Sequence, residues 1–172
     1  MPIRSYKFID LFCGIGGFHR AMHSLGAYCV MSCDIDDNAR KTYVENYKKV
    51  MPSLLESFPK DITQVDEKSI PSFDVLCAGF PCQPFSQAGH KKGFSDKGRG
   101  NLFFDIMRIV DSKRPKVLFL ENVRHLVNHD GGKTFQRIQK ELPADTLLGA
   151  GTVLDPTTAR LAIMNGAKFI VS

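Results

Sequence analysis

The segment FIDLFCGIGG, residues 8–17, decides the fold. It begins within an apolar run, Lys7 to Phe12, that predicts a buried β-strand, and its glycines predict a tight turn. A helix is expected over Phe18 to Leu25, with Gly26 as its C-terminal cap because glycine adopts the left-handed conformation without strain. A strand, a glycine-rich turn and a helix in this order let a ligand approach backbone N–H groups and the positive end of the helix.

The same alternation of strand and helix continues along the chain, and it predicts an α/β fold with a parallel sheet. A short strand is expected beside the tripeptide Asp61-Ile62-Thr63. After about residue 143, a strand, a helix and a strand are predicted over residues 146–150, 156–165 and 168–171. The other predicted strands are Tyr28–Cys33, Phe73–Ala78 and Lys116–Leu120, and the other predicted helices are Asn38–Lys49, Asn101–Ser112 and Thr134–Leu142.

Length and composition exclude several classes of protein. A chain of 172 residues has the usual length of one domain. Its apolar runs are far shorter than the roughly 20 residues that a membrane helix needs, and its first residues do not predict a signal peptide, so we expect a cytosolic protein. The five cysteines include no C-x-x-C pair, so neither a disulfide framework nor a metal site is expected. The net charge of +5 favours polyanionic partners only mildly.

An acidic residue strengthens the case for a nucleoside ligand at the glycine turn. Asp34 ends the second predicted strand, 20 residues after Gly14. A carboxylate there can accept hydrogen bonds from both ribose hydroxyls of an adenosine. The alternatives are a purely structural turn and an acid that caps the next helix. The glycine spacing differs from the dinucleotide fingerprint G-x-G-x-x-G, so S-adenosylmethionine, which has no pyrophosphate, fits better than a nicotinamide cofactor.

A rigid loop follows the third long strand and presents one thiol. Cys82 lies between Pro81 and Pro84, and the fixed φ angles of the two prolines stiffen the loop. In a parallel sheet this is the carboxyl end of a strand, where ligands bind, and a thiolate there is a good nucleophile for soft carbon. His90 makes no convincing partner for a Cys–His hydrolase. The other cysteines are expected to be buried and structural: Cys13, Cys29, Cys33 and Cys77.

Glu121 follows another predicted strand and would face the same crevice as Cys82. A carboxyl group among apolar strand residues can act as an acid or as a hydrogen-bond partner of a substrate. The alternative for Glu121 is a cap on the helix that follows.

These motifs together resemble the DNA cytosine-5 methyltransferases. The segments FIDLFCGIGG (8–17), GFPCQPFS (79–86) and ENV (121–123) closely resemble three ordered motifs of that family, and RGNLF (99–103) resembles a fourth. Asp61 matches the acidic position that meets the adenine amino group in the family. The resemblance covers residues 6–142 and implies a Rossmann-like, S-adenosylmethionine-dependent methyltransferase core with a parallel sheet.

The resemblance also implies roles for particular residues. Cys82 would add to carbon 6 of a cytosine flipped out of double-stranded DNA, and Glu121 would bind its exocyclic amine and stabilise protonation at ring nitrogen 3. S-adenosylmethionine would be the methyl donor and S-adenosylhomocysteine the product. The basic stretch at residues 90–99 would contact phosphates. The donor-binding residues would be Phe12, Gly14, Gly16, Gly17, Asp34, Ile35, Asp61 and Ile62, and the DNA-contacting residues Pro81, Gln83, Ser86, Arg99 and Asn122.

The sequence departs from the family pattern after residue 142. Its 172 residues contain no Gln-x-Arg-x-Arg motif, no target-recognition region and no C-terminal motif of the kind that completes the donor site. The segments LGAGTVL (148–154) and NGAKFIVS (165–172) resemble a β-α-β piece of a keto-deoxy-phosphogluconate aldolase barrel. No aldolase activity is expected, because the Schiff-base lysine of that barrel belongs to a later strand.

We therefore expect a catalytic core at residues 1–142 and a β-α-β extension at residues 143–172 that packs on the same sheet. The protein would act on DNA in a bacterial cytoplasm, near the nucleoid, or in a eukaryotic nucleus, with no membrane partner. The alternative from a different class is a truncated or chimeric α/β protein that keeps the donor fold but does not catalyse. The sequence leaves the oligomeric state open.

Overall fold

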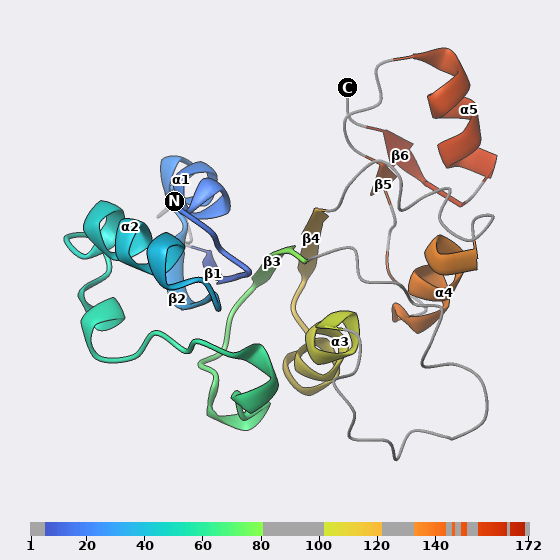
Figure 1. Cartoon of the computed structure of the whole chain (residues 1–172). Coiled ribbons are helices and arrows are strands. Elements are labelled where there is room, and N and C mark those ends of the chain that lie inside the picture. The colour runs from blue at the N-terminus through green and yellow to red at the C-terminus, as the bar shows by residue number, and fades with distance from the viewer. Residues whose placement is uncertain are drawn as a thin grey trace, which may run out of the picture. The chain divides into compact units, whose positions relative to one another are not determined.

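The computed structural model describes residues 6–80, 102–121, 133–143, 146, 149–150, 155–164 and 166–170, and the chain forms two compact units (Figure 1). The first unit is Met1–Arg124 and the second is His125–Ser172. The boundary predicted between residues 142 and 143 thus differs from the boundary between the two compact units, which falls after Arg124. In the described parts of the chain, no helix combines the length and the apolar character needed to cross a membrane.

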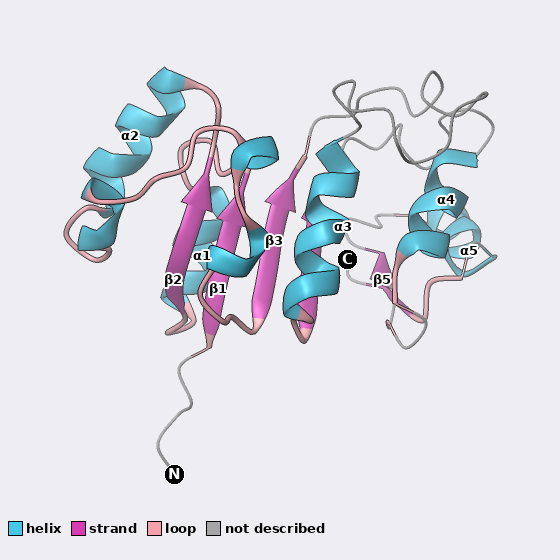
Figure 2. Ribbon diagram, turned by 90° about the horizontal axis from the view of Figure 1, so that it is seen from below, coloured by secondary structure: helices cyan, strands magenta, loops and turns pink. Residues whose placement is uncertain are grey.

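The first unit is built on a four-stranded parallel sheet, drawn in magenta in Figure 2, with the strand order β2-β1-β3-β4. The central strand β1 is Lys7–Leu11, and all of its residues except Lys7 are buried. The other strands are β2 (Tyr28–Cys33), β3 (Val75–Gly79) and β4 (Val117–Glu121). The α/β class and the parallel sheet predicted from the sequence are confirmed.

Helices lie on both sides of this sheet, as Figure 2 shows for α1 (Gly17–Ser24) and α3 (Leu102–Lys113). The helix α2 (Asp37–Tyr47) follows β2. Its first turn is fixed by Asp36, whose side chain accepts a hydrogen bond from the N–H of Ala39 at 2.7 Å. Apolar residues of α1, α2 and the strands share one buried cluster that includes Phe8, Met22 and Tyr43. Burial of these side chains provides the main driving force for folding this unit.

The connection between α2 and β3 is irregular and contains three short 3₁₀ helices: η1 (Pro52–Leu55), η2 (Ile62–Gln64) and η3 (Glu67–Ser69). The prediction of a short strand beside Asp61-Ile62-Thr63 is wrong, because the described chain between β2 and β3 forms only α2 and the three 3₁₀ helices, and the tripeptide itself leads into η2. The cause is local: the carboxylate of Asp61 accepts hydrogen bonds from both the N–H and the hydroxyl of Thr63, at 2.9 and 2.8 Å. Such a side-chain cap starts a helical turn and competes with strand pairing.

The second unit contains α4 (Lys133–Glu141), β5 (Gly149–Ala150), α5 (Pro156–Met164) and β6 (Phe169–Ile170). The strand, helix and strand predicted for the C-terminal extension are present. Within the described residues, β5 pairs with β6 in a parallel two-stranded sheet that is separate from the four-stranded one. Gly166 ends α5 with a φ of 94°, the left-handed conformation that favours glycine.

Candidate functional site

A pocket of about 300 Å³ opens at the carboxyl ends of β1, β2 and β3. The chain leaves β1 toward β2 on one side and later returns to β3 on the other side. This reversal is the topological switch point at which α/β sheets bind ligands. The pocket is lined by Phe12, Cys33, Asp34, Ile35, Lys60, Asp61, Ile62, Gly79 and Leu102.

Five of the eight predicted donor-binding residues line this pocket, although they come from three separate segments of the sequence. They are Phe12, Asp34, Ile35, Asp61 and Ile62. The other three, Gly14, Gly16 and Gly17, form the turn beside it and the start of α1. Ile35 is 67 % exposed, which leaves an apolar surface open at the pocket.

The turn after β1 runs through left-handed backbone conformations. Phe12 has a φ of 55°, Gly14 of 53° and Gly16 of 97°. For Phe12, which has a Cβ atom, this conformation costs about 1–2 kcal/mol. Strain of this kind is retained where the surrounding structure fixes the backbone, and it is frequent at binding sites.

Asp34 connects this turn to the end of β2. Its Oδ2 accepts a hydrogen bond from the N–H of Gly14 at 2.7 Å, and its Oδ1 accepts one from the N–H of Asp36 at 2.8 Å. The two bonds fix the orientation of the carboxylate at the pocket wall. A carboxylate has about four acceptor sites, so both oxygens retain capacity for the hydroxyls of a ligand.

Side chains of α2 hold the carbonyl groups of the glycine turn. The hydroxyl of Tyr47 donates to the carbonyl of Gly16 at 2.7 Å, and the amide of Asn46 donates to the carbonyl of Ile15 at 3.3 Å. The ring of Tyr47 also stacks on the ring of His19, with 3.9 Å between the centroids. A Cβ atom on Gly16 would lie only 2.2 Å from the ring of Tyr47, so only glycine fits here.

We expect Gly16→Ala to lower the free energy of unfolding by about 2–4 kcal/mol, through left-handed strain and the clash with Tyr47. Gly17→Ala is the matched control, because a Cβ atom there meets nothing within 4 Å and the residue begins a helix. The control should change stability by less than about 1 kcal/mol. Urea unfolding of both variants measures the difference, and equal effects would contradict the role assigned to the ring of Tyr47.

A buried polar cluster lies beneath the turn. The carboxyl group of Asp10, which is fully buried in β1, accepts the N–H of His19 at 3.2 Å through Oδ2. Its Oδ1 has no hydrogen-bond partner among the described residues. Nδ1 of His19 and the hydroxyl of Tyr43 are 2.6 Å apart, and that hydroxyl is also 2.6 Å from the hydroxyl of Ser32.

Burial shifts both titrating groups of this cluster toward their neutral forms. It raises the pKa of Asp10 to about 8, and the nearby charge of Asp34 adds to this effect. It lowers the pKa of His19 to about 4, with a smaller contribution from His23. The folded protein therefore keeps the Asp10 proton and a neutral His19 imidazole at pH 7.

The two shifts affect stability in opposite directions. The neutral Asp10 contributes stability that is present below its unfolded pKa of 3.8 and is lost as the pH rises through about 8. The neutral His19 contributes stability that is present above its unfolded pKa of 6.5 and is lost as the pH falls through about 4. The effects oppose each other between pH 4 and 6.5, and only that of Asp10 remains between pH 6.5 and 8.

We therefore expect the free energy of unfolding to fall between pH 6.5 and 8, by at most about 1.4 kcal/mol per pH unit. Asp10→Asn should remove this slope, because an amide resembles the protonated acid and does not titrate. Denaturant titrations at several pH values measure it. Asp111→Asn is the control, since Asp111 is exposed on α3. A wild-type slope that persists in Asp10→Asn would contradict the assignment.

Glu121 is the predicted catalytic residue that the structure describes. It ends β4 and lies opposite Gly79 in the register of β3 and β4. Its Oε2 would be 3.4 Å from a Cβ atom on Gly79, so the carboxylate lies over a residue that lines the pocket. The other predicted catalytic residue and the predicted DNA contacts lie outside the described residues: Cys82, Pro81, Gln83, Ser86, Arg99 and Asn122.

Sequence reasoning missed several residues that shape the pocket. Arg40 donates to the carbonyls of Asp34, Phe58 and Pro59 at 2.6–3.0 Å, and so connects the end of β2 to the segment that leads to Asp61. An acid within the apolar run 8–12 was a usable signal for Asp10. No comparable signal marks Arg40, because its acceptors are backbone carbonyls. Asn46, Tyr47, Lys60 and Leu102 were also missed.

Comparison with known proteins places these features in a family. Residues 6–145 match the C-5 cytosine-specific DNA methylases. The chain is 50 % identical over 136 residues to the Type II methyltransferase M.HhaI of Haemophilus parahaemolyticus, covering 79 % of this chain and 39 % of that protein. It is 46 % identical over 171 residues to M.DsaV of Dactylococcopsis salina, covering 99 % of this chain and 46 % of that protein.

Solved structures agree on the fold. The DNMT2 of Spodoptera frugiperda, solved as a triple mutant, matches with a TM-score of 0.54 and 27 % identity, over 80 % of this chain and 41 % of that one. The Dnmt2 methyltransferase of S. pombe matches with a TM-score of 0.53 and 19 % identity, over 80 % and 40 %. The fold is therefore the Rossmann-like α/β fold of methyltransferases.

The chain belongs to the C-5 cytosine-specific DNA methylase family. This assignment excludes a nicotinamide-dependent enzyme, which the glycine spacing favours less than a protein that binds S-adenosylmethionine. The chain spans less than half the length of the relatives named above. The alignment with M.DsaV extends into residues 143–172, and the aldolase resemblance of those residues stays a prediction.

Proposed function

We propose that this protein methylates carbon 5 of cytosine in double-stranded DNA with S-adenosylmethionine as the methyl donor. The observation that carries the proposal is the pocket at the switch point, where acidic and apolar residues from several separate segments meet in a chain of this family. Its volume of about 300 Å³ lies at the lower end of the range of small-molecule sites.

The residues of the pocket fit the adenosine part of the donor. Asp34 would accept hydrogen bonds from the two ribose hydroxyls, and Asp61 would accept one from the amino group of the adenine. Ile35 and Phe12 offer apolar surface to the faces of the base. When bound, the donor supplies an electrophilic methyl group on a sulfonium centre, and S-adenosylhomocysteine is the product.

The state of the described cysteines supports Cys82 as the nucleophile. The four described cysteines are free and buried, as predicted from the sequence. Burial raises the pKa of Cys29, Cys33 and Cys77 to about 12, and it also raises that of Cys13. A buried thiol that stays protonated is a poor nucleophile. Cys82 is the fifth cysteine of the chain, and it follows Gly79 by three residues.

In the proposed reaction, the thiolate of Cys82 forms a bond to carbon 6 of a flipped cytosine, which makes carbon 5 nucleophilic. Glu121 would hold the exocyclic amine and favour protonation at ring nitrogen 3. After methyl transfer, loss of the proton from carbon 5 breaks the bond between sulfur and carbon 6. The basic stretch 90–99 would contact phosphates, in keeping with the net charge of +5.

The donor site predicts that Asp34→Ala weakens S-adenosylmethionine binding at least tenfold, because two ribose hydroxyls lose a charged acceptor. Isothermal titration calorimetry on the 172-residue chain measures the dissociation constant. Glu45→Ala is the control, since Glu45 is exposed near the far end of α2. Tighter binding of NAD than of S-adenosylmethionine would contradict the proposal.

The nucleophile is tested by covalent trapping. In 5-fluorocytosine the proton at carbon 5 is replaced by fluorine, so the adduct with the thiol persists after methyl transfer. We expect a covalent complex between the protein and a random-sequence duplex that contains this base, with S-adenosylmethionine present. Cys82→Ser should form none, and Cys77→Ser should still form it whenever the variant folds.

If the folded wild-type chain binds the donor but forms no adduct, the proposal of catalysis by this chain is wrong. The chain would then be the alternative, a truncated or chimeric α/β protein that keeps the fold of the methyl-donor site but does not catalyse.

A further inference from the structure

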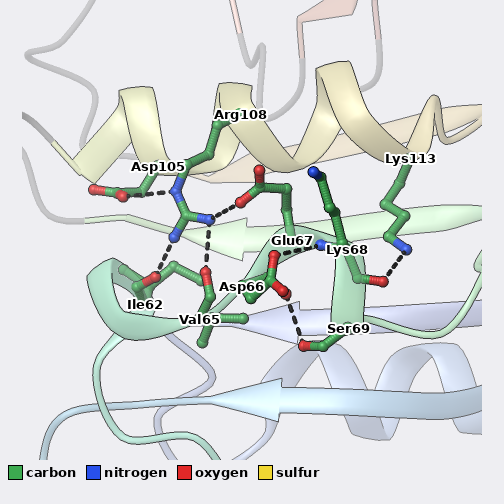
Figure 3. A network of polar contacts seen from close by, with 9 residues as sticks. All are labelled: Ile62, Val65, Asp66, Glu67, Lys68, Ser69, Asp105, Arg108 and Lys113. Carbon is green, nitrogen blue, oxygen red and sulfur yellow. Dashed lines mark hydrogen bonds and ion pairs between the residues drawn. The ribbon is translucent and has the colours of Figure 1, made fainter.

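The pocket wall that carries Asp61 is held in place by one residue of α3. Arg108 extends its guanidinium across the segment 62–67, as Figure 3 shows. Nη2 donates to the carbonyl of Ile62 at 2.5 Å, and Nη1 donates to the carbonyl of Val65 and to the carboxylate of Glu67, each at 2.7 Å. Nε donates to Asp105 on the same helix at 3.1 Å.

These contacts reach Asp61 through a single peptide plane. The group between Ile62 and Thr63 presents its carbonyl to Arg108 and its N–H to the Asp61 carboxylate, at 2.9 Å. Because a peptide group is planar, fixing its carbonyl also fixes the direction of its N–H. The orientation of the Asp61 carboxylate therefore depends on a guanidinium that does not line the pocket.

The geometry of the arginine suits this task. A guanidinium is a rigid, planar donor array, and here it uses all three nitrogens on four acceptors. Its side chain is 29 % exposed, so solvent competes only partly for these bonds. Leu102, at the start of the same helix, lines the pocket. Arg108 thus joins two walls of the pocket, the helix α3 and the segment that begins at Asp61.

We propose that Arg108 is a positioning residue that gives the pocket its preference for a purine with an exocyclic 6-amino group, acting on Asp61 through the Ile62–Thr63 peptide. The inference rests on the proposed donor site. A correctly oriented carboxylate accepts a hydrogen bond from the amino group of adenine. It repels the carbonyl oxygen that hypoxanthine carries at the same place, because both are acceptors.

The test compares S-adenosylhomocysteine with S-inosylhomocysteine, which differs in this amino group. Calorimetric titration of the 172-residue wild-type chain should show a preference for the adenine compound. In Arg108→Met the preference should fall about tenfold, mainly through weaker binding of the adenine compound. Arg108→Lys should recover part of the preference, since an ammonium can reach one carbonyl but cannot reproduce the planar array.

Lys113→Met is the matched control, because Lys113 lies on the same helix and donates to the carbonyl of Lys68 at 3.1 Å and not to the Ile62–Thr63 peptide (Figure 3). It should keep the wild-type preference. Circular dichroism melts establish that each variant folds. If Arg108→Met does not fold, Arg108→Lys is the deciding variant: a preference weaker than that of the wild type supports the role of Arg108, and an unchanged preference contradicts it.

The outcomes separate this inference from the function on which it rests. A wild-type chain that binds neither compound overturns the proposed donor site and the inference with it. A wild-type chain that prefers adenine, together with a folded Arg108→Met that keeps the preference, overturns the role of Arg108 alone. A wild-type chain that binds both compounds equally also overturns it.

Discussion

The backbone at the end of β1 has to leave the sheet through left-handed conformations, and the rest of the site depends on this constraint. Phe12, Gly14 and Gly16 all have positive φ angles. The turn is held by the Asp34 carboxylate on one side and by the Tyr47 hydroxyl on the other. β1 lies between β2 and β3 in the parallel sheet. The turn that follows it leads directly into α1 and borders the pocket.

Irregular segments around the pocket are fixed by side chains that bind backbone carbonyls. Arg40 binds the carbonyls of Phe58 and Pro59, and Arg108 binds those of Ile62 and Val65. A loop without ladder hydrogen bonds leaves such carbonyls in need of partners, and each guanidinium satisfies several of them at once. The two arginines therefore do for the segment 58–65 what pairing does for the strands.

The buried polar cluster beneath the turn differs from these arginine contacts. One of its polar atoms lowers stability, but the same side chain also helps to hold the site. Asp10 is kept neutral by burial, and one of its oxygens lacks a partner among the described residues. An unpaired buried polar atom is destabilising. The same carboxyl group nevertheless binds the N–H of His19 near the start of α1, next to the turn that borders the pocket. Polar groups retained at such a cost are expected where a site must be held in one conformation.

The sequence by itself determined the strands of the first unit, the glycine turn and the carboxylate at the end of β2, because apolar runs, glycines and strand-end acids leave local patterns. It also determined the family, through motifs that keep their order. It did not predict the 3₁₀ turn at Ile62, where the cap made by Asp61 competes with a strand.

Only the tertiary structure decided which side chains hold the pocket. Tyr47 reaches Gly16 across 31 positions, and Arg108 reaches Ile62 across 46. In both cases the acceptor is a backbone carbonyl. Every residue carries such a carbonyl, so no pattern of residue types indicates which one a distant side chain will bind.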